Sequence, residues 1–304
     1  MKKKASTFVV SLTPFDADGR LDEEGLRLHL RRMRGAGIGV YVGSGSSGEG
    51  FTLTLAETRR IMEIAKEELQ GHVPVRAMGS EPRSARQMIE YAQIVEEVGL
   101  DGTQVYSIDM GHGWKPVEQE IETYFSDVLE QVHQPSIIST HVFGVGYLVP
   151  LAVLKRLVDR FENVIGINCT SDLQYLCELI DLLGSKVEIH VGGPMWALSA
   201  LAMGANGYLS SEANLAPKLC QSVIDYHESG QFDLRDAAYA KVIRLWPACY
   251  KYGSIRGTKA TLNMLGLAGG YPRRPRLQTV PESAKPEILK LLNELDIAKI
   301  EGWK

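Results

Sequence analysis

The chain has 304 residues, of which 44% are hydrophobic and 23% are charged, and its formal net charge at pH 7 is −4. This balance is typical of a globular protein with a large core, and it argues against a nucleic-acid-binding or disordered chain. The basic start ends at Lys4, no export signal follows it, and no apolar stretch is long enough to span a bilayer. We therefore expect a cytoplasmic protein with neither nucleic acid nor a membrane among its partners.

The four cysteines are too widely spaced to form a recognisable motif. They are Cys169, Cys177, Cys220 and Cys249, and none belongs to a CxxC pair. The spacing therefore predicts neither a zinc knuckle nor a redox centre, and a disulfide framework is not expected in a chain of this size without an export signal. We expect no metal and no cofactor.

Eight short apolar runs alternate with helical patterns along the first two thirds of the chain. The runs are rich in Val and Ile and continuous rather than alternating, which is typical of parallel strands covered on both faces. We predict strands over residues 7–12, 39–43, 73–78, 102–107, 136–141, 164–168, 187–191 and 205–209.

Between these runs, apolar residues recur at spacings of three and four, and glycine often follows the last of them. That combination predicts amphipathic helices with glycine at their ends. Eight such units predict an α/β protein of the (β/α)₈ TIM barrel class. A doubly wound sheet is the alternative, but its glycine fingerprint is missing after the first strand, where Leu12–Phe15 stands instead.

The alternation stops near residue 214. We expect the barrel to occupy residues 1–214 and a C-terminal helical domain to occupy 215–304, with helices over 218–227, 235–250, 255–265 and 282–300. A basic cluster of Arg273, Arg274 and Arg276 lies in a connecting loop, where we expect it to form a solvated surface.

In a barrel of this class the functional site lies at the carboxyl ends of the strands. The second strand runs into the small residues of Gly43–Gly48, followed by Glu49. Small residues let a ligand approach the backbone, and hydroxyl and N–H groups suit a carboxylate or a phosphate. A plain strand–helix turn with a serine cap explains the same residues.

Other side chains at the strand ends carry weaker signals. His112, His141 and His190 could form a metal site, but no HxH or HxxxH spacing supports one, and ordinary hydrogen-bonded histidines are the simpler interpretation. Cys169 could be a nucleophile activated by His141, although packing is the simpler role. We find no lysine at the end of any predicted strand; Lys115, in the fourth loop, is the nearest.

Several segments together resemble the superfamily of dihydrodipicolinate synthase and N-acetylneuraminate lyase over nearly the whole chain. The resemblance implies a (β/α)₈ barrel with a C-terminal helical domain, assembled as a dimer or tetramer. It also implies pyruvate or another 2-keto acid bound as an imine on a sixth-strand lysine, with carbon–carbon bond chemistry or loss of water. The segments that carry the resemblance are 12–15, 45–49, 52–54, 99–102, 164–167, 204–207, 213–214 and 259–266.

The resemblance implies roles for individual residues. Ser46 and Ser47, with Gly48, stand where the family holds the keto-acid carboxylate, and Leu209 stands where a backbone carbonyl lines the pocket. Three catalytic positions differ from the family pattern: Asn168 replaces the lysine, Ser139 replaces the catalytic tyrosine, and Gly144 replaces the arginine that binds the second substrate's carboxylate.

These differences lead to two functional hypotheses. The first is a lyase that binds a small, pyruvate-like 2-oxo or hydroxy carboxylate and performs aldolase- or hydratase-type chemistry without a lysine imine. Asn168 would stabilise a developing oxygen charge and His141 or His112 would transfer protons, with Ser139 at the tyrosine position. The alternative is a catalytically inactive member that acts as a metabolite-binding or regulatory subunit.

Overall fold

Eight parallel strands close into a barrel in the order β1 to β8, so the fold is the expected (β/α)₈ TIM barrel and not a doubly wound sheet. The computed structural model describes residues 4–277 and 280–303 of the chain, without the side chains of Pro247 and Cys249. The strands are β1 (Ser6–Val10), β2 (Gly39–Val42), β3 (Val75–Ala77), β4 (Thr103–Val105), β5 (Ser136–His141), β6 (Val164–Thr170), β7 (Glu188–Gly192) and β8 (Gly207–Ser210).

Each predicted apolar run overlaps one of these strands, and β5 has the predicted limits. At the other strands the ends differ by up to two residues; β6, for example, continues two residues beyond Asn168 to Thr170. The extension is paired with both neighbouring strands: Cys169 and Thr170 lie in register with Thr140 and His141 of β5, and Cys169 is also in register with Val191 of β7. The predicted strand ended at the polar Asn168, because the apolar pattern stops there, but backbone pairing continues the strand to Thr170.

Most helices follow the expected alternation with the strands. The α-helices are α1 (Glu23–Ala36), α2 (Leu55–Leu69), α3 (Ala85–Val98), α4 (Glu118–Leu129), α5 (Val142–Val145), α6 (Leu151–Arg160), α7 (Leu173–Leu183), α8 (Ala197–Met203), α9 (Pro217–Glu228), α10 (Phe232–Tyr250), α11 (Ile255–Met264), α12 (Lys285–Glu294) and α13 (Ile297–Glu301). Three short 3₁₀ turns are η1 (Gly50–Thr52), η2 (Glu212–Asn214) and η3 (Glu282–Ala284).

Local sequence signals explain where these helices begin and end. Asp22 caps α1 by accepting from Gly25 N–H, and Thr54 and Glu57 form a reciprocal capping box at the start of α2. Gly37 and Gly99 end α1 and α3 in the left-handed conformation, which glycine adopts without strain.

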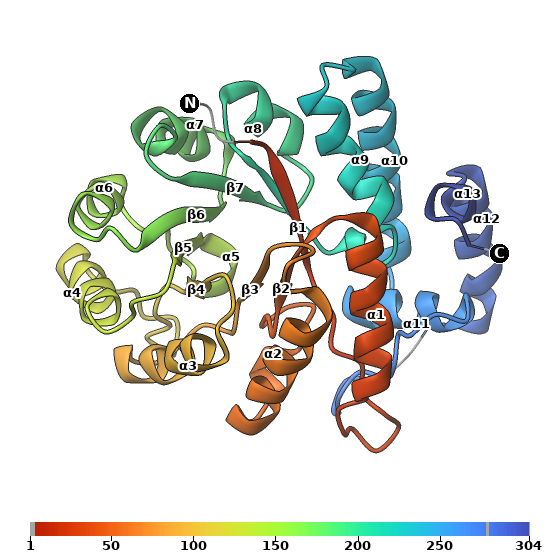
Figure 1. Ribbon diagram of the computed structural model, residues 1–304, viewed down its shortest axis with the longest axis horizontal. Coiled ribbons are helices and arrows are strands. Elements are labelled where there is room, and N and C mark those ends of the chain that lie inside the picture. Colours follow the sequence, from red (N-terminus) through yellow and green to blue (C-terminus); the bar gives the residue numbers. More distant parts are fainter. Residues whose placement is uncertain (1–3, 278–279, 304) are drawn as a thin grey trace. The chain divides into compact units, whose positions relative to one another are not determined.

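The chain divides into two compact units, which we call unit 1 (Arg76–Leu209 with the start of the chain) and unit 2 (Ser6–Val75 and Ser210–Lys304). In unit 1, helices α3, α4, α6 and α7 lie outside the strands β4 to β7 (Figure 1). In unit 2, α9 packs along α10. The division expected at residue 214 stays a prediction.

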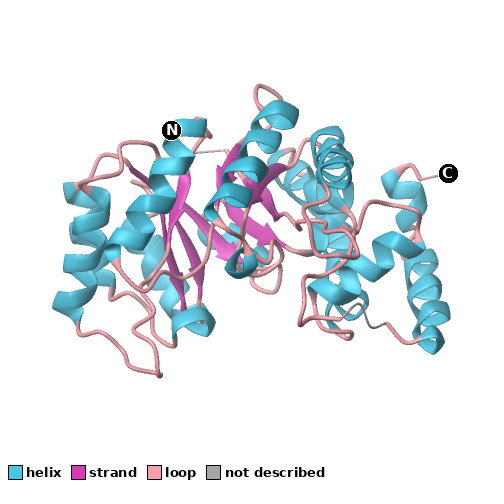
Figure 2. Cartoon of the chain, turned by 90° about the horizontal axis from the view of Figure 1, so that it is seen from below, coloured by secondary structure: helices cyan, strands magenta, loops and turns pink. Residues whose placement is uncertain are grey.

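The chain after β8 is helical, as expected; the part that leads to the C-terminus contains helices and loops (Figure 2). The helix predicted over 282–300 is interrupted, because Asp296 takes a left-handed φ of 57° between α12 and α13. No helix within the described ranges is long and apolar enough to cross a membrane.

A buried ion pair joins the loop after β2 to helix α11 in unit 2. Lys259 Nζ donates to Glu49 Oε2 at 2.5 Å and to the carbonyls of Thr13 and Tyr271 at 2.7 and 2.9 Å. Both charged side chains are 0% exposed. Burial lowers the pKa of Lys259 to about 8, opposed by the charge of Glu49. The amine therefore stays protonated at neutral pH, and its three N–H groups each have an acceptor.

The basic cluster at Arg273 is not the solvated surface that we expected. Arg273 is 17% exposed and donates to both carboxylate oxygens of Glu57. Its guanidinium also donates to the carbonyl of Gly19 and lies 4.2 Å from the centre of the Phe15 ring. The expectation was wrong because these partners are more than 200 residues away in sequence. Arg274 is exposed, as expected.

Replacing Lys259 by methionine should lower the apparent free energy of unfolding by about 3–5 kcal/mol, because the change leaves the buried Glu49 carboxylate without its closest cation. Denaturant unfolding followed by circular dichroism measures the loss. The control is Lys251→Met, which removes an exposed ion pair with Glu287 and should have a much smaller effect, because solvent screens this pair. Equal effects of the two substitutions would show that the buried pair does not stabilise unit 2.

The pairing of Glu57 with Arg273 predicts a pH dependence. The Arg273 hydrogen bond, opposed by burial, lowers the pKa of Glu57 from 4.5 to about 2. Its contribution is therefore present above pH 4.5 and is lost as the pH falls toward 2. Glu57→Gln should destabilise the protein by roughly 1–3 kcal/mol at pH 6, and by progressively less below pH 4.5. Denaturant unfolding measured from pH 3 to 7 tests this prediction. The control Glu24→Gln changes an exposed carboxylate and should have little effect on stability at any of these pH values. A loss of stability in Glu57→Gln that does not depend on pH would contradict the prediction.

Candidate functional site

The loop after β2 is a tight turn that buries Ser44 and Ser47 and exposes Ser46. Gly48 N–H donates to Ser44 Oγ at 3.0 Å, and a Cβ on Gly48 would lie only 2.7 Å from the Ser44 nitrogen, so a side chain does not fit there. Ser47 is buried and its hydroxyl lies 3.0 Å from that of Ser211, whereas Ser46 is exposed. The expected carboxylate-binding residues thus lie in a turn whose backbone is closely packed.

Leu209 belongs to β8 and is buried. Its carbonyl accepts a hydrogen bond from Gly193 N–H at 3.0 Å. A carbonyl has two lone pairs, so it can still accept from a ligand. Whether it does so stays a prediction.

Asn168 is a buried residue of strand β6. Its amide Nδ2 donates to Gln104 Oε1 at 2.5 Å across the intervening β5, and both side chains are buried. Ser139 on β5 and His190 on β7 are its register partners, so they point to the same face. The structure thus brings Asn168 and Ser139 together on one face, and Gln104 holds the Asn168 amide in place.

An ion pair lies at the same face, nearer the start of the strands. Arg76 on β3 contacts Glu188 on β7 at 3.1 Å. Burial and the charge of Arg76 lower the pKa of His190 to about 3, so this histidine is neutral at pH 7. His112 is exposed in the fourth loop. Among the described residues, no three His, Cys, Asp or Glu side chains are grouped to hold a metal ion, so the histidine set considered from sequence does not form.

At the carboxyl ends of β4 and β5, Ser107 Oγ donates to the Ser139 carbonyl at 2.8 Å. Tyr147 donates its phenol to the nearby Ile108 carbonyl at 2.9 Å. Burial raises the pKa of Tyr147 to about 12, opposed by an interaction with Ser107. Sequence reasoning missed this tyrosine, because it follows α5 and does not lie on a strand.

His141 at the end of β5 has a carboxylate partner that the sequence did not reveal. Its Nδ1 lies 3.8 Å from Glu81 Oε1, and both side chains are partly buried. Burial raises the pKa of Glu81, but His141 and a backbone N–H outweigh it, and the net pKa is lowered. A Cβ on Gly144 would lie 2.5 Å from Glu81 Oε1 and 2.7 Å from His141 Nδ1. The pair therefore occupies the space beside the position where the family has an arginine.

Cys169 points to the opposite face from its neighbours Asn168 and Thr170, because strand residues alternate. It is buried, and burial raises the pKa of its thiol to about 11. His141 is in register with Thr170. The cysteine therefore lacks both the thiolate character and the partner of a nucleophile, which agrees with a packing role.

The lysines that the structure describes in unit 1 are all exposed: Lys4, Lys115, Lys155 and Lys186. Lys155 and Lys186 both contact Asp159, and Lys115 lies in the fourth loop. In the part of the chain that the structure describes, Lys259 is the one buried lysine. Sequence reasoning missed it because it lies on a helix of unit 2, and its three hydrogen bonds commit it to the turn at Glu49.

Known proteins are similar to this chain along nearly its whole length. A 4-hydroxy-tetrahydrodipicolinate synthase from Methanococcus maripaludis is 26% identical over 289 residues, covering 95% of this chain and 97% of the relative. A protein named "uncharacterized DapA-like lyase" from Pyrobaculum aerophilum is 29% identical over 308 residues, covering 97% and 99%.

Solved structures support the same fold. A dihydrodipicolinate synthase from Thermotoga maritima has a TM-score of 0.88 at 20% identity, covering 97% of this chain and 99% of the other. A prophage protein of the dihydrodipicolinic acid synthase family from E. coli K12, solved in complex with pyruvate, has a TM-score of 0.86 at 23% identity and covers 96% and 99%.

The sequence model of the dihydrodipicolinate synthetase family matches residues 3–295 of this chain. These residues include every strand of the barrel and the helices through α12. The chain belongs to the dihydrodipicolinate synthetase family.

Proposed function

We propose that this protein is a lyase of its family that binds a small 2-oxo or hydroxy carboxylate and acts without a lysine imine. One observation carries the proposal: the sixth-strand position of the family's lysine holds Asn168, a buried amide hydrogen-bonded to Gln104. An amide nitrogen is not a usable nucleophile toward a ketone, whereas an amine in a dry site is. As the resemblance implies, the working form would be a dimer or tetramer.

The ligand's carboxylate would bind at the loop after β2. The buried Ser47 hydroxyl, held by Ser211, and the exposed Ser46 hydroxyl provide oxyanion donors next to Gly48. A preorganised hydroxyl loses little freedom when it binds a ligand. The pyruvate complex of the E. coli relative supports a pyruvate-like ligand.

Asn168 would act by hydrogen bonding. A fixed amide donor placed where negative charge develops on an oxygen stabilises the transition state without forming a bond. The contact with Gln104 fixes the orientation of the amide. The ligand's carbonyl or enolate oxygen is the group that it would recognise.

His141 would transfer the proton, and Glu81 would orient it. A carboxylate beside an imidazole can orient the ring, and Glu81 Oε1 lies 3.8 Å from His141 Nδ1. Ser139 is a far weaker acid or base than the tyrosine it replaces, so the proton-transfer role falls on this pair.

The first test asks whether an imine forms. Incubating the protein with pyruvate and borohydride should leave its mass unchanged, because the interior amide cannot condense with the ketone. Asn168→Lys should gain the mass of a reduced pyruvate adduct, and Asn168→Met should not. Intact-protein mass spectrometry provides the readout. An adduct on the unsubstituted protein, located by peptide mapping, would overturn the proposal.

The second test asks whether the protein moves protons on a 2-oxo acid. Exchange of the pyruvate methyl protons in D₂O, followed by NMR, should be catalysed by the protein and slowed about 10²- to 10⁴-fold by His141→Asn. Glu81→Gln should slow it less. His133→Asn, an exposed histidine between α4 and β5, should leave the rate unchanged. Pyruvate binding without any exchange would favour the inactive, metabolite-binding alternative.

A further inference from the structure

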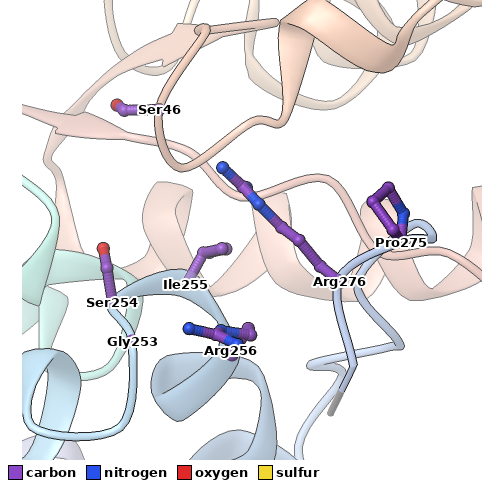
Figure 3. A pocket seen from close by; sticks show the side chains of 7 residues that line it. All are labelled: Ser46, Gly253, Ser254, Ile255, Arg256, Pro275 and Arg276. Carbon is purple, nitrogen blue, oxygen red and sulfur yellow. The ribbon is translucent and has the colours of Figure 1, made fainter.

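Unit 2 contains a pocket of about 410 Å³ between the loop after β2, the start of α11 and the segment around Pro275 (Figure 3). It is lined by Ser46, Gly253, Ser254, Ile255, Arg256, Pro275 and Arg276. The lining therefore combines two guanidinium groups and two hydroxyls with the apolar side chains of Ile255 and Pro275. Such a donor-rich lining suits an oxyanion.

Arg276 crosses the pocket toward the loop that carries Ser46 (Figure 3). Its guanidinium lies 4.7 Å from the centre of the Phe51 ring, which holds the plane of the group in place. Nη1 is buried without a protein hydrogen-bond partner and lies 3.6 Å from Glu49 Oε1, too far for a hydrogen bond. Arg276 thus keeps donor capacity that the protein itself does not use.

Arg256 lies across the pocket from Arg276 and folds against Gly253. A Cβ on Gly253 would lie 2.4 Å from Nη2 of Arg256, so the guanidinium packs on the bare Cα. Gly253 has a φ of +87°, which favours glycine in any case. Within residues 4–277 and 280–303, no carboxylate lies within 4.0 Å of the Arg256 guanidinium. Its charge is therefore uncompensated by the protein.

The charges around this pocket do not balance. Among the described residues, Glu49 is the carboxylate that Arg276 approaches, and Oε2 of Glu49 already accepts from Lys259. Its Oε1 accepts from the backbone N–H of Arg273 at 3.1 Å. Lys259 and Arg276 thus share one carboxylate, and Arg256 has none within 4.0 Å among the described residues, so the three cations exceed the one carboxylate by two positive charges.

We propose that this pocket binds a second anionic group of the ligand, a carboxylate or a phosphate. This inference rests on the proposed function for the first carboxylate, and Ser46 connects the two, because it is both a residue of the carboxylate loop and part of the pocket lining. The preferred substrate class is therefore a 2-oxo or hydroxy acid with a second acidic group, and not pyruvate itself. The residue at the family's arginine position is Gly144, so this chain needs another cation to recognise such a group.

The test compares two ligands that differ in the distal carboxylate alone: 2-oxoglutarate and 2-oxopentanoate. Calorimetry on the full chain should show 2-oxoglutarate binding at least tenfold more tightly. Arg256→Gln and Arg276→Gln should each reduce that preference about tenfold to hundredfold, while 2-oxopentanoate affinity changes less than about threefold. Arg274→Gln, which removes the same charge from an exposed position outside the lining, is the control and should preserve the preference.

Arg276→Lys controls for a folding defect, since it keeps the charge near Glu49 but loses the planar pair of donors. This variant should keep the unfolding midpoint of the unsubstituted protein and lose most of the preference for 2-oxoglutarate. A preference near one in the unsubstituted protein, or one untouched by both arginine substitutions, would overturn the proposal.

Inorganic phosphate separates the two proposals. If neither oxo acid binds, the proposed function fails, but the pocket should still bind phosphate with an affinity that falls at least tenfold in Arg256→Gln and weakens with added salt. Equal phosphate affinity in the unsubstituted protein and in both arginine variants would show that the pocket is not an anion site. Phosphate binding more tightly than malonate would assign the second group to a phosphate ester, and the reverse order to a carboxylate.

Discussion

The buried contact between Lys259 and Glu49 is the interaction on which the organisation of unit 2 depends. It joins residues 210 positions apart and ties helix α11 to the loop after β2, while the same amine holds the carbonyls of Thr13 and Tyr271. A charge in such a place is costly unless it is paired and fully hydrogen-bonded. Because these conditions are met, the carboxylate loop and the arginine-lined pocket have fixed positions relative to each other within this unit.

In unit 1 the polar interior of the strands decides what chemistry is available. Asn168, Gln104, Ser139 and His190 provide neutral donors and acceptors, and Arg76 is engaged by Glu188. An environment of this kind can stabilise charge on a ligand oxygen, and none of these side chains carries a primary amine for covalent capture. In the proposed function, the partly buried His141 beside Glu81 at the strand ends transfers the proton.

Much of the fold could be predicted from the sequence, and less of the site. Continuous Val- and Ile-rich runs located all eight strands, because burial on both faces leaves a local signal. Contacts between distant residues leave none: the lysine that pairs with Glu49 and the carboxylate beside His141 had no signature, and Arg273 was wrongly assigned to the solvated surface for the same reason. The sequence did not reveal that the helix predicted over 282–300 is interrupted at Asp296, since a left-handed non-glycine residue is not visible in an amphipathic pattern.

Gly144 has a consequence for how this lineage can change. Its Cα is so close to the Glu81 carboxylate and the His141 ring that even a methyl group would collide with both. An arginine could return to this position only after the histidine–glutamate arrangement had been dismantled. The residue at position 144 is therefore coupled to those at 81 and 141, because any side chain larger than that of glycine requires both neighbours to move.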